Sequence, residues 1–509
     1  MEILETYSAA LKEYRAKNYD KSLQILNEVK KIAPNWANTI LLEAFICRDK
    51  ELYVSEIFLL EKFFSVVDIS KEKVAARDAY SLLASVFSKV GRSVQAIDLF
   101  KISSRLETDR TEIGQELSNA LFAAASVENF SAADFEKIYA EYRKNLADIV
   151  PYPKTLYQHK KLRVGYLSAD FCLHPVMFFA YNLITGHNKN LFDIYCYSAT
   201  EKTDAVTENI KNSVTVWRDI STLSNEDAAK IIRADEIDIL VDLSGHSSGN
   251  RLPIMAYRPA TVQISGLGYM NSTGLHCVDY FLSDVNCAAD TNYFTENLIE
   301  MDHSHFCFSP LKIYPAINHV EKNFITFGCF NNFNKVTDSI LKAWREILNA
   351  VPNSKLILKN KIFNTEECRK FILERLKNLG LNTEQIEMRR FAADYLEQYN
   401  EIDIALDTFP YNGGVTTCEA LLMGVPVISL RGDRHGNRMT YSILKNVGVE
   451  ELATSNLNEY IQRAIYLAND KDLLQVLHKN LRTMFQNSPL TDSKNYVREI
   501  EEIYSVIVR

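Results

Sequence analysis

Short apolar runs alternate with amphipathic stretches over the last two thirds of the chain. Five of these runs are mostly apolar and are bounded by turn-forming residues: 162–171, 192–198, 237–245, 324–330 and 427–430. Such runs are typical of strands buried in a parallel sheet, and helical periodicity separates one from the next. A final amphipathic stretch, 493–508, has no strand after it and is predicted to pack back across the middle region. The pattern predicts two α/β halves, 160–318 and 319–509.

The first 150 residues follow a different pattern, with apolar positions three or four residues apart. They hold only two of the 17 glycines and one of the 12 prolines, which predicts short paired helices. Small and aromatic residues recur at the spacing of a tetratricopeptide (TPR) repeat: Ala84, Phe87, Gly91, Ala96, Phe100 and Ser103. The segment 42–70 is degenerate, and about three helix pairs are expected. Such an array either binds a protein partner or a second copy on its concave face, or only supports the next domain.

Composition limits the classes of function. The 509 residues are too many for one core, and 47% hydrophobic and 24% charged residues are ordinary for folded domains. A net charge of −8 disfavours broad attraction to nucleic acid or to anionic membranes, so neither is expected as a partner. There is no apolar run of membrane-spanning length, no signal-type segment at the start, and no C-x-x-C pair among nine cysteines. A cytoplasmic location is therefore expected.

The segment 402–430 combines a strand, a glycine-rich turn, a helix and a second strand. Gly413 and Gly414 break regular structure, and Thr416 and Thr417 lie where the helix is predicted to begin. A turn of this kind leaves backbone N–H groups at the positive end of a helix dipole, an arrangement that binds phosphate. The alternative is an ordinary tight turn in a β-α-β crossover.

Polar residues gather where the predicted strands of the middle region end. Asp170 and His174 follow the first of these strands, and Asp242, Ser244 and His246 follow a later one. In open α/β sheets the carboxyl ends of the strands face the ligand crevice, so His174 and His246 are candidates for catalytic contact. Each is alternatively a solvated or structural histidine.

Three further features carry weaker signals. Gly266 and Gly268 lack the spacing of a dinucleotide-binding fold, so an oxidoreductase is only weakly supported. His303 and His305 suggest a metal site, but without nearby partner ligands they are expected on a strand or loop face. Lys335 follows a predicted strand and precedes a helix, where it is placed either to meet a phosphate or to remain a solvated surface lysine.

These motifs together resemble one family. After the helical region the chain reads, in order, VGYLSADFCLHP, ILVDLSGHSSGNR, RPATVQISGLGYMNSTG, FGCFNNFNKVTD and ALDTFPYNGGVTTCEALLMGVP. Nearly the whole chain resembles the nucleocytoplasmic protein O-glycosyltransferases, which are the O-GlcNAc transferases and their SPINDLY relatives. The resemblance implies TPR-like helices over 1–150, followed by an α/β GT-B glycosyltransferase of two Rossmann-like halves. It also implies an inverting, metal-independent transfer, without a cofactor, from a sugar nucleotide in the second half to a Ser or Thr hydroxyl of a protein.

The same resemblance assigns roles by position. Lys335 matches the lysine that contacts the donor diphosphate, and Asn332 lies beside it. Thr416 and Thr417, with Gly413 in the same loop, match the phosphate loop. The remaining matches are Glu419 at the donor ribose, Tyr395 against the base, Gly268 near the sugar, His174 in the active-site cleft and Asp235 as an aspartate proposed in some mechanisms.

The donor sugar is left open by the sequence. Gly414 and Val415 replace polar residues of the O-GlcNAc transferase loop, and Tyr395 replaces a histidine, although tyrosine stacks on either kind of base. The leading hypothesis is transfer of GlcNAc from UDP-GlcNAc. Fucose transfer from GDP-fucose is the alternative, because the segment around His246 looks more like SPINDLY. A TPR adaptor with an inactive transferase is a third hypothesis, and a homo-oligomer formed through the TPR region is a further expectation.

Overall fold

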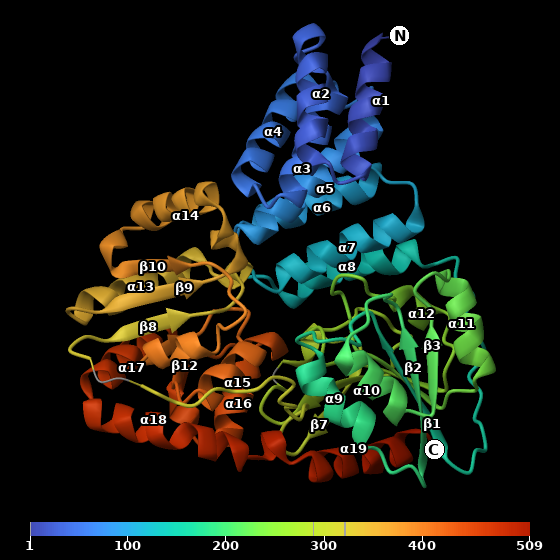
Figure 1. Cartoon of the computed structure of the whole chain (residues 1–509). Helices are drawn as coiled ribbons and strands as arrows, with labels where there is room; N and C mark the ends of the chain where they lie inside the picture. Colours follow the sequence, from blue (N-terminus) through green and yellow to red (C-terminus); the bar gives the residue numbers. More distant parts are fainter. Residues whose placement is uncertain (1, 289, 320–321) are drawn as a thin grey trace. The chain divides into compact units, whose positions relative to one another are not determined.

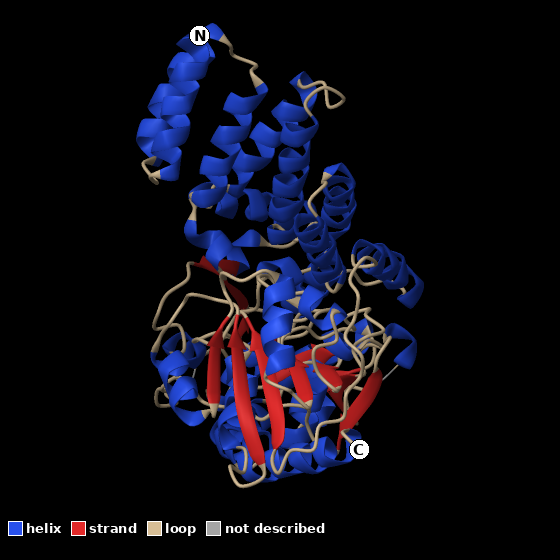
Figure 2. Ribbon diagram, turned by 90° about the vertical axis from the view of Figure 1, so that its right-hand side faces the viewer, coloured by secondary structure: helices blue, strands red, loops and turns tan. Residues whose placement is uncertain are grey.

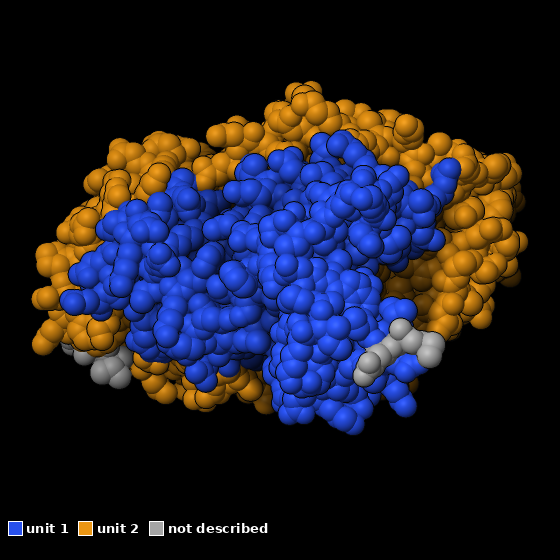
Figure 3. Space-filling view, turned by 90° about the horizontal axis from the view of Figure 1, so that it is seen from above, with its two compact units in different colours: residues 1–127, 332–341, 358–391 blue, residues 128–331, 342–357, 392–509 orange. Residues whose placement is uncertain are grey.

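The computed structural model describes residues 2–288, 290–319 and 322–509. The chain forms two compact units, which Figure 3 shows in different colours. Unit 1 comprises residues 1–127, 332–341 and 358–391, and unit 2 comprises 128–331, 342–357 and 392–509. Within the described ranges, no helix has both the length and the apolar character needed to cross a bilayer.

Unit 1 begins with helices that pack as hairpins (Figure 1). They are α1 (Glu2–Arg15), α2 (Tyr19–Ile32), α3 (Ala37–Asp49), α4 (Tyr53–Val66), α5 (Lys73–Lys89), α6 (Ser93–Leu106) and α7 (Arg110–Ala124). Three pairs form, as expected, and the segment 42–70, whose repeat pattern is degenerate, contributes to the second pair, α3 with α4. Ala84 and Ala96 are fully buried between α5 and α6, and Gly91 turns the chain with a φ of +80°, which favours glycine.

The helical array of unit 1 packs against α14 (Glu366–Asn378) of the same unit. The Glu367 carboxylate accepts hydrogen bonds from the Val54 N–H at 3.1 Å and from the Ser55 hydroxyl at 2.6 Å. Arg375 donates to the Val90 carbonyl at 3.2 Å. Part of the array's surface is therefore covered by α14, which favours the supporting role for these helices. Unit 1 also holds η2 (Phe333–Lys335), η3 (Lys361–Asn364), η4 (Thr383–Gln385) and β10 (Ile386–Arg389).

The first sheet lies in unit 2 and has seven parallel strands in the order β3-β2-β1-β4-β5-β6-β7. The strands are β1 (Leu162–Ser168), β2 (Phe192–Ser198), β3 (Val216–Asp219), β4 (Ile239–Asp242), β5 (Val262–Ser265), β6 (Tyr280–Asp284) and β7 (Asn297–Met301). Helices flank them (Figure 2): α8 (Ala132–Asn145), α9 (Met177–Gly186), α10 (Ala205–Ser213), α11 (Asn225–Ala234) and α12 (Leu252–Ala256), with η1 (Thr291–Tyr293) before β7. Apolar residues on both faces of β4 and β5 are buried, as the continuous apolar runs require.

The second sheet has six strands in the order β10-β9-β8-β11-β12-β13, and β11 pairs in parallel with β8 and β12. Its other elements are β8 (Thr326–Cys329), β9 (Lys355–Lys359), β11 (Ile404–Leu406), β12 (Val427–Leu430), β13 (Ala453–Thr454), α13 (Asp338–Ala350), α15 (Val415–Leu422), α16 (Met439–Val447), α17 (Leu457–Asn469) and α18 (Lys471–Gln486). Short 3-10 turns connect them: η5 (Glu397–Glu401), η6 (His435–Asn437), η7 (Glu450–Leu452) and η8 (Pro489–Thr491).

The last helix, α19 (Ser493–Ile507), packs on α9 of the first sheet, which confirms the predicted return to the middle region. Glu501 accepts a hydrogen bond from the Asn188 N–H at 2.7 Å, and its other contact is the ring of His187 at 3.1 Å. The Tyr496 hydroxyl donates to the carbonyl of His305 at 2.8 Å. The first sheet therefore obtains part of its helical cover from the end of the chain.

Candidate active site

Three buried aspartates stand at carboxyl ends of strands in unit 2. Asp242 ends β4, Asp284 ends β6 and Asp407 follows β11, and each is almost completely shielded from solvent. Each accepts hydrogen bonds from backbone N–H groups of the loop that follows its strand. A buried carboxylate with several donors fixes a loop more firmly than neutral side chains do. These three aspartates thus set the shape of the loops at the carboxyl ends of their strands.

Asp407 holds the glycine-rich turn. Its Oδ1 accepts the N–H of Thr408 and of Gly413, both at 2.8 Å, and the amide of Asn331 at 3.1 Å. Its Oδ2 accepts the Ser429 hydroxyl at 2.7 Å. Burial raises the pKa of Asp407, while these hydrogen bonds oppose the increase. The carboxylate ties β8, β11 and β12 to the turn.

Gly413 is required by the packing of this turn. A Cβ atom at position 413 would lie 2.6 Å from the Thr417 hydroxyl and 2.8 Å from the Thr416 hydroxyl, well inside van der Waals contact. Both hydroxyls are already engaged, since that of Thr416 donates to Asn331 at 2.6 Å and that of Thr417 lies 3.1 Å from the Thr440 hydroxyl. The turn and the start of α15 are therefore packed as one piece.

The helix after this turn begins one residue earlier than the sequence suggested. Gly414 occupies the N-cap position, and Val415 is the first residue of α15. Glycine has no side chain to accept the first N–H groups of the helix, and no side-chain cap is formed. The start of α15 therefore presents backbone donors and the positive end of the helix dipole, which together suit a phosphate group.

Tyr395 and Glu419 meet beside the same helix. The Tyr395 hydroxyl donates a short hydrogen bond to Glu419 and accepts one from the Lys312 ammonium at 2.7 Å. The Lys312 nitrogen also lies 4.7 Å from the centre of the Tyr395 ring and 3.7 Å from the Glu419 carboxylate. The ammonium thus lies beside the hydroxyl end of the ring that is expected to contact the base. Nothing in the sequence around Lys312 marks this lysine, which lies at a bend in the loop between β7 and β8.

His174 follows β1 and stays accessible, with 43% of its side chain exposed. Its Nδ1 lies 3.6 Å from an Asp170 oxygen, too far for a strong hydrogen bond. Partial burial lowers the pKa of His174 below its ordinary value, although the negative charge of Asp170 opposes this. The imidazole is therefore neutral near pH 7 and has a nitrogen able to accept a proton.

His246 does not open onto the crevice. It is completely buried, packs against Tyr139, Tyr142 and Tyr269, and bonds the Thr273 carbonyl through Nε2 at 2.9 Å. Burial lowers its pKa to about 4, so the ring is neutral. These contacts are those of a core residue that secures the loop after β4, which corrects the expectation of a histidine in the cleft.

Gly268 and Asp235 take part in packing contacts. A Cβ atom at position 268 would lie 1.9 Å from the Leu243 carbonyl oxygen, so glycine lets two crevice loops pass closely. Asp235 caps the carboxyl end of α11, just before β4 begins. Its carboxylate accepts hydrogen bonds from Tyr197 at 2.9 Å and from Arg218 at 2.7 Å. The structure does not bring Asp235 to His174. Asp235 lies before the amino end of β4, whereas His174 lies after the carboxyl end of β1, the parallel strand beside it.

Lys335 and Asn332 belong to unit 1. Lys335 closes η2, with its backbone N–H bonded to the Asn332 carbonyl at 3.0 Å, and it is half-buried. The Asn332 side chain accepts a hydrogen bond from Asn360 at 3.3 Å. The other predicted donor-binding residues, Gly413, Thr416, Thr417, Glu419, Tyr395 and Gly268, belong to unit 2.

Sequence reasoning missed Asn331, Asp407 and Lys312 as residues of this site. Asp407 has a visible signal, because an aspartate directly after an apolar strand is placed at the carboxyl end of a sheet. Asn331 carries no comparable signal, because its bonds to Asp407 and Thr416 depend on the adjacency of β8 and β11.

Two Rossmann-like sheets with an uncapped helix after the glycine-rich turn define the GT-B class of glycosyltransferases, preceded here by TPR-like helices. The family model for glycosyl transferase family 41 matches residues 135–323 and 316–500. The chain belongs to this family, as the sequence motifs indicated.

Individual relatives agree with this assignment. A tomato (Solanum lycopersicum) protein named probable UDP-N-acetylglucosamine–peptide N-acetylglucosaminyltransferase SPINDLY is 36% identical over 383 residues, which cover 73% of this chain and 40% of that protein. The Arabidopsis thaliana protein SEC, with the same enzyme name, is 30% identical over 68% of this chain and 37% of its own length. A mutant O-GlcNAc transferase from Thermobaculum terrenum aligns with a TM-score of 0.86 and 27% identity, over 100% of this chain and 97% of that one. The chain thus spans well under half the length of these plant relatives.

Proposed function

We propose that this protein transfers GlcNAc from UDP-GlcNAc to Ser or Thr hydroxyls of a protein, with inversion and without a metal ion at the donor diphosphate. The names of the relatives, which describe UDP-N-acetylglucosamine–peptide N-acetylglucosaminyltransferases, support the choice of donor and acceptor. The expected partners are therefore the sugar nucleotide and an acceptor protein.

One observation carries the proposal: the start of α15 has no side-chain cap and follows a turn that Asp407 and Gly413 hold in one shape. When the bond between the anomeric carbon and the diphosphate breaks, negative charge develops on the leaving phosphate. Fixed backbone donors stabilise such charge without reorganising during the reaction. Thr416 and Thr417 are therefore assigned to the diphosphate, as is Lys335 from its place in the sequence.

In the proposed reaction, the acceptor oxygen forms a bond to the anomeric carbon from the side opposite the leaving group. The bond from that carbon to the diphosphate oxygen breaks at the same time, and UDP departs with the electron pair. The acceptor hydroxyl loses its proton, and the neutral His174 is the candidate to accept it or to orient the hydroxyl. Glu419 and Tyr395 are assigned to the nucleoside, where Lys312 restricts their movement.

The test uses the full chain, a library of Ser- and Thr-containing peptides, and mass spectrometry of the products. UDP-GlcNAc is expected to raise the melting temperature, because it binds only the folded protein, and to yield peptides heavier by one GlcNAc. Adding Mg²⁺ or Mn²⁺ should leave the rate unchanged.

GDP-fucose in a parallel reaction serves as the matched control. Fucosylated peptides and stabilisation by GDP-fucose alone would replace the proposal with the O-fucosyltransferase hypothesis. Absence of binding to both nucleotides would point to the adaptor hypothesis. A cytoplasmic location and a homo-oligomer through the TPR-like helices are also proposed, to be tested by cell fractionation and by light scattering.

A further inference from the structure

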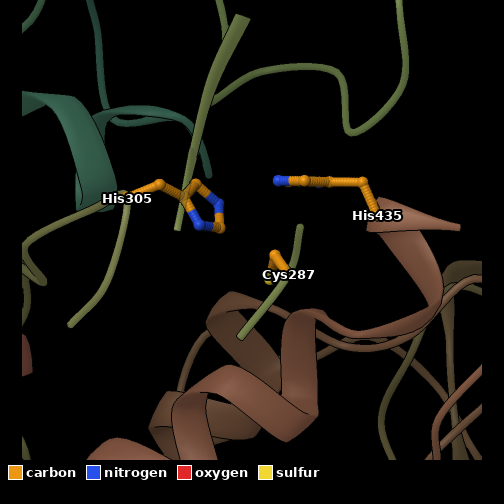
Figure 4. A group of neighbouring side chains, drawn as sticks. All are labelled: Cys287, His305 and His435. Atoms are coloured by element: carbon orange, nitrogen blue, oxygen red, sulfur yellow. The ribbon is translucent and has the colours of Figure 1, made fainter. Parts of the chain in front are cut away.

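Three metal-ligating side chains converge in the interior of unit 2, apart from the residues assigned to the donor. Cys287 lies in the turn after β6, His305 follows β7, and His435 begins η6 after β12. Their ligand atoms all lie within 4.8 Å of one another, and Figure 4 shows the three side chains turned toward a common point. The two strands β6 and β7 belong to the first sheet and β12 to the second, so the cluster joins the two halves.

All three side chains are shielded from solvent, with exposures of 0% for Cys287 and His305 and 1% for His435. The Nε2 atom of His305 and both ring nitrogens of His435 are buried and form no hydrogen bond of normal geometry among the described residues. Buried polar atoms nearly always have a partner, and leaving several of them unmatched in one place is costly. A cation bound at the common point would occupy the Nε2 lone pair of His305 and one lone pair of His435, whose other ring nitrogen, as N–H, interacts with the Met270 backbone.

Asp284 prepares His305 to be such a ligand. Its Oδ2 lies 2.5 Å from Nδ1 of His305 and also accepts the Ser442 hydroxyl at 3.0 Å. Its Oδ1 accepts the N–H of Cys287 at 2.8 Å. When Nδ1 donates to the carboxylate, the lone pair of His305 is on Nε2, which is the tautomer that binds metal in carboxylate–histidine–metal arrangements.

The chemistry of the ligands indicates the kind of ion. One thiolate and two imidazoles suit Zn²⁺, a borderline-soft ion that prefers sulfur and nitrogen. A Zn²⁺ ion with bonds of about 2.3 Å to sulfur and about 2.0 Å to nitrogen holds its ligand atoms about 3.5 Å apart, so side-chain rotations would close the cluster around it. The thiolate and the Asp284 carboxylate together would balance the charge of a divalent ion in this interior.

We propose that Cys287, His305 and His435 bind one Zn²⁺ ion, which fastens the two Rossmann-like halves together. The ion is structural and lies outside the assigned donor site, so the proposal is independent of which sugar is transferred. The competing explanation is a metal-free packing cluster, in which His435 lies against His305 and Phe281 with ring centres 4.9 Å and 5.2 Å apart.

Metal content of the full chain, purified without a polyhistidine tag from zinc-supplemented medium, provides the first test. Equimolar zinc is expected in the unmodified protein and in the control Cys196→Ser, which changes another fully buried cysteine outside the cluster. Cys287→Ser and His435→Phe are expected to lose the zinc. Zinc retained by both cluster variants, or absent from the unmodified protein, would overturn the proposal.

A second test needs no variant and therefore remains decisive if the variants misfold. Replacing the ion by Co²⁺ in the unmodified protein should produce a thiolate-to-cobalt charge-transfer band. Absence of the thiolate band would refute the assignment of Cys287.

Melting temperature separates the zinc site from simple packing, because phenylalanine preserves the aromatic contacts of His435 but cannot bind metal. Under the proposal, His435→Phe lowers the melting temperature, and a strong chelator lowers that of the unmodified protein toward the same value. An unchanged or higher melting temperature in His435→Phe would support packing alone.

Discussion

Replacing Gly413 by alanine is the sharpest test of the phosphate turn. The added Cβ would lie 2.6 Å from the Thr417 hydroxyl, 2.8 Å from the Thr416 hydroxyl and 3.1 Å from Asp407 Oδ1. Contacts this short force both threonines to move by several tenths of an ångström. Their hydrogen bonds to Asn331 and Thr440 would weaken or break.

The cost to stability is moderate. Two neutral hydrogen bonds contribute about 1–3 kcal/mol together, whereas a folded domain is stable by about 5–15 kcal/mol. Gly413→Ala is therefore expected to fold. Displacing the start of α15 should cost at least one charge-assisted hydrogen bond to the donor phosphate, or about 1.5–3 kcal/mol, which corresponds to about a 10- to 150-fold weaker affinity.

Isothermal titration calorimetry with UDP measures this loss directly. The matched control is Gly436→Ala, since a Cβ atom there would meet its nearest neighbours in Met270 at 3.4 Å, an ordinary contact. This control should bind UDP as the unmodified protein does. Affinity within twofold of normal in a folded Gly413→Ala protein would refute the role of the turn, and an equal loss in Gly436→Ala would show that the effect is general.

Further predictions concern the other assigned residues. His174→Ala should lower kcat about 100-fold or more, whereas the control His303→Ala, at an exposed histidine, should not. If His174→Ala kept most of its kcat, His174 would not be the general base. Partial burial lowers the pKa of His174, so the neutral form that a base requires is still populated below pH 6.5. The fall of kcat/KM on the acid side should therefore lie below pH 6.5, and His174→Ala should abolish this fall. Lys335→Ala should abolish turnover with an unchanged melting temperature. Near-normal activity in the purified variant would show that Lys335 does not stabilise the donor diphosphate. Tyr395→Phe removes the hydroxyl that donates to the Glu419 carboxylate and should lower the free energy of unfolding in urea by about 1.5–3 kcal/mol; no change would mean that the bond is not formed in solution.

The fold could be predicted in large part because its strands are short, apolar and separated by helices. The runs at 192–198 and 427–430 coincide with β2 and β12, and the final helix was placed within one residue of α19. In contrast, the helix at the turn was expected to begin at Thr416, because threonine is a better N-cap than glycine. The structure places the cap at Gly414, where tertiary packing around Asp407 outweighs this local preference.

The candidate site was only partly predictable, because its decisive contacts join segments distant in the sequence. Lys312 reaches Tyr395 across 83 positions and Asn331 reaches Asp407 across 76. Spacing rules address neighbours along the chain, so they cannot find such pairs. The same limit explains His305: its expected place on a strand or loop face followed from the lack of partner ligands nearby in the sequence, whereas Asp284 and His435, which follow strands of different sheets, are its neighbours in the structure.

The return of α19 to the first sheet has a consequence for how the protein is made. The face of α9 that α19 covers consists largely of apolar residues, and Val497 fills the space beside Gly186. While the chain is being synthesised, the first half is complete in sequence well before this cover exists. The apolar face of α9 therefore stays partly exposed until about 190 further residues, ending with α19, have emerged from the ribosome. Formation of the second half is thus a condition for completing the first, and variants that slow the second should expose α9 to chaperones or to aggregation.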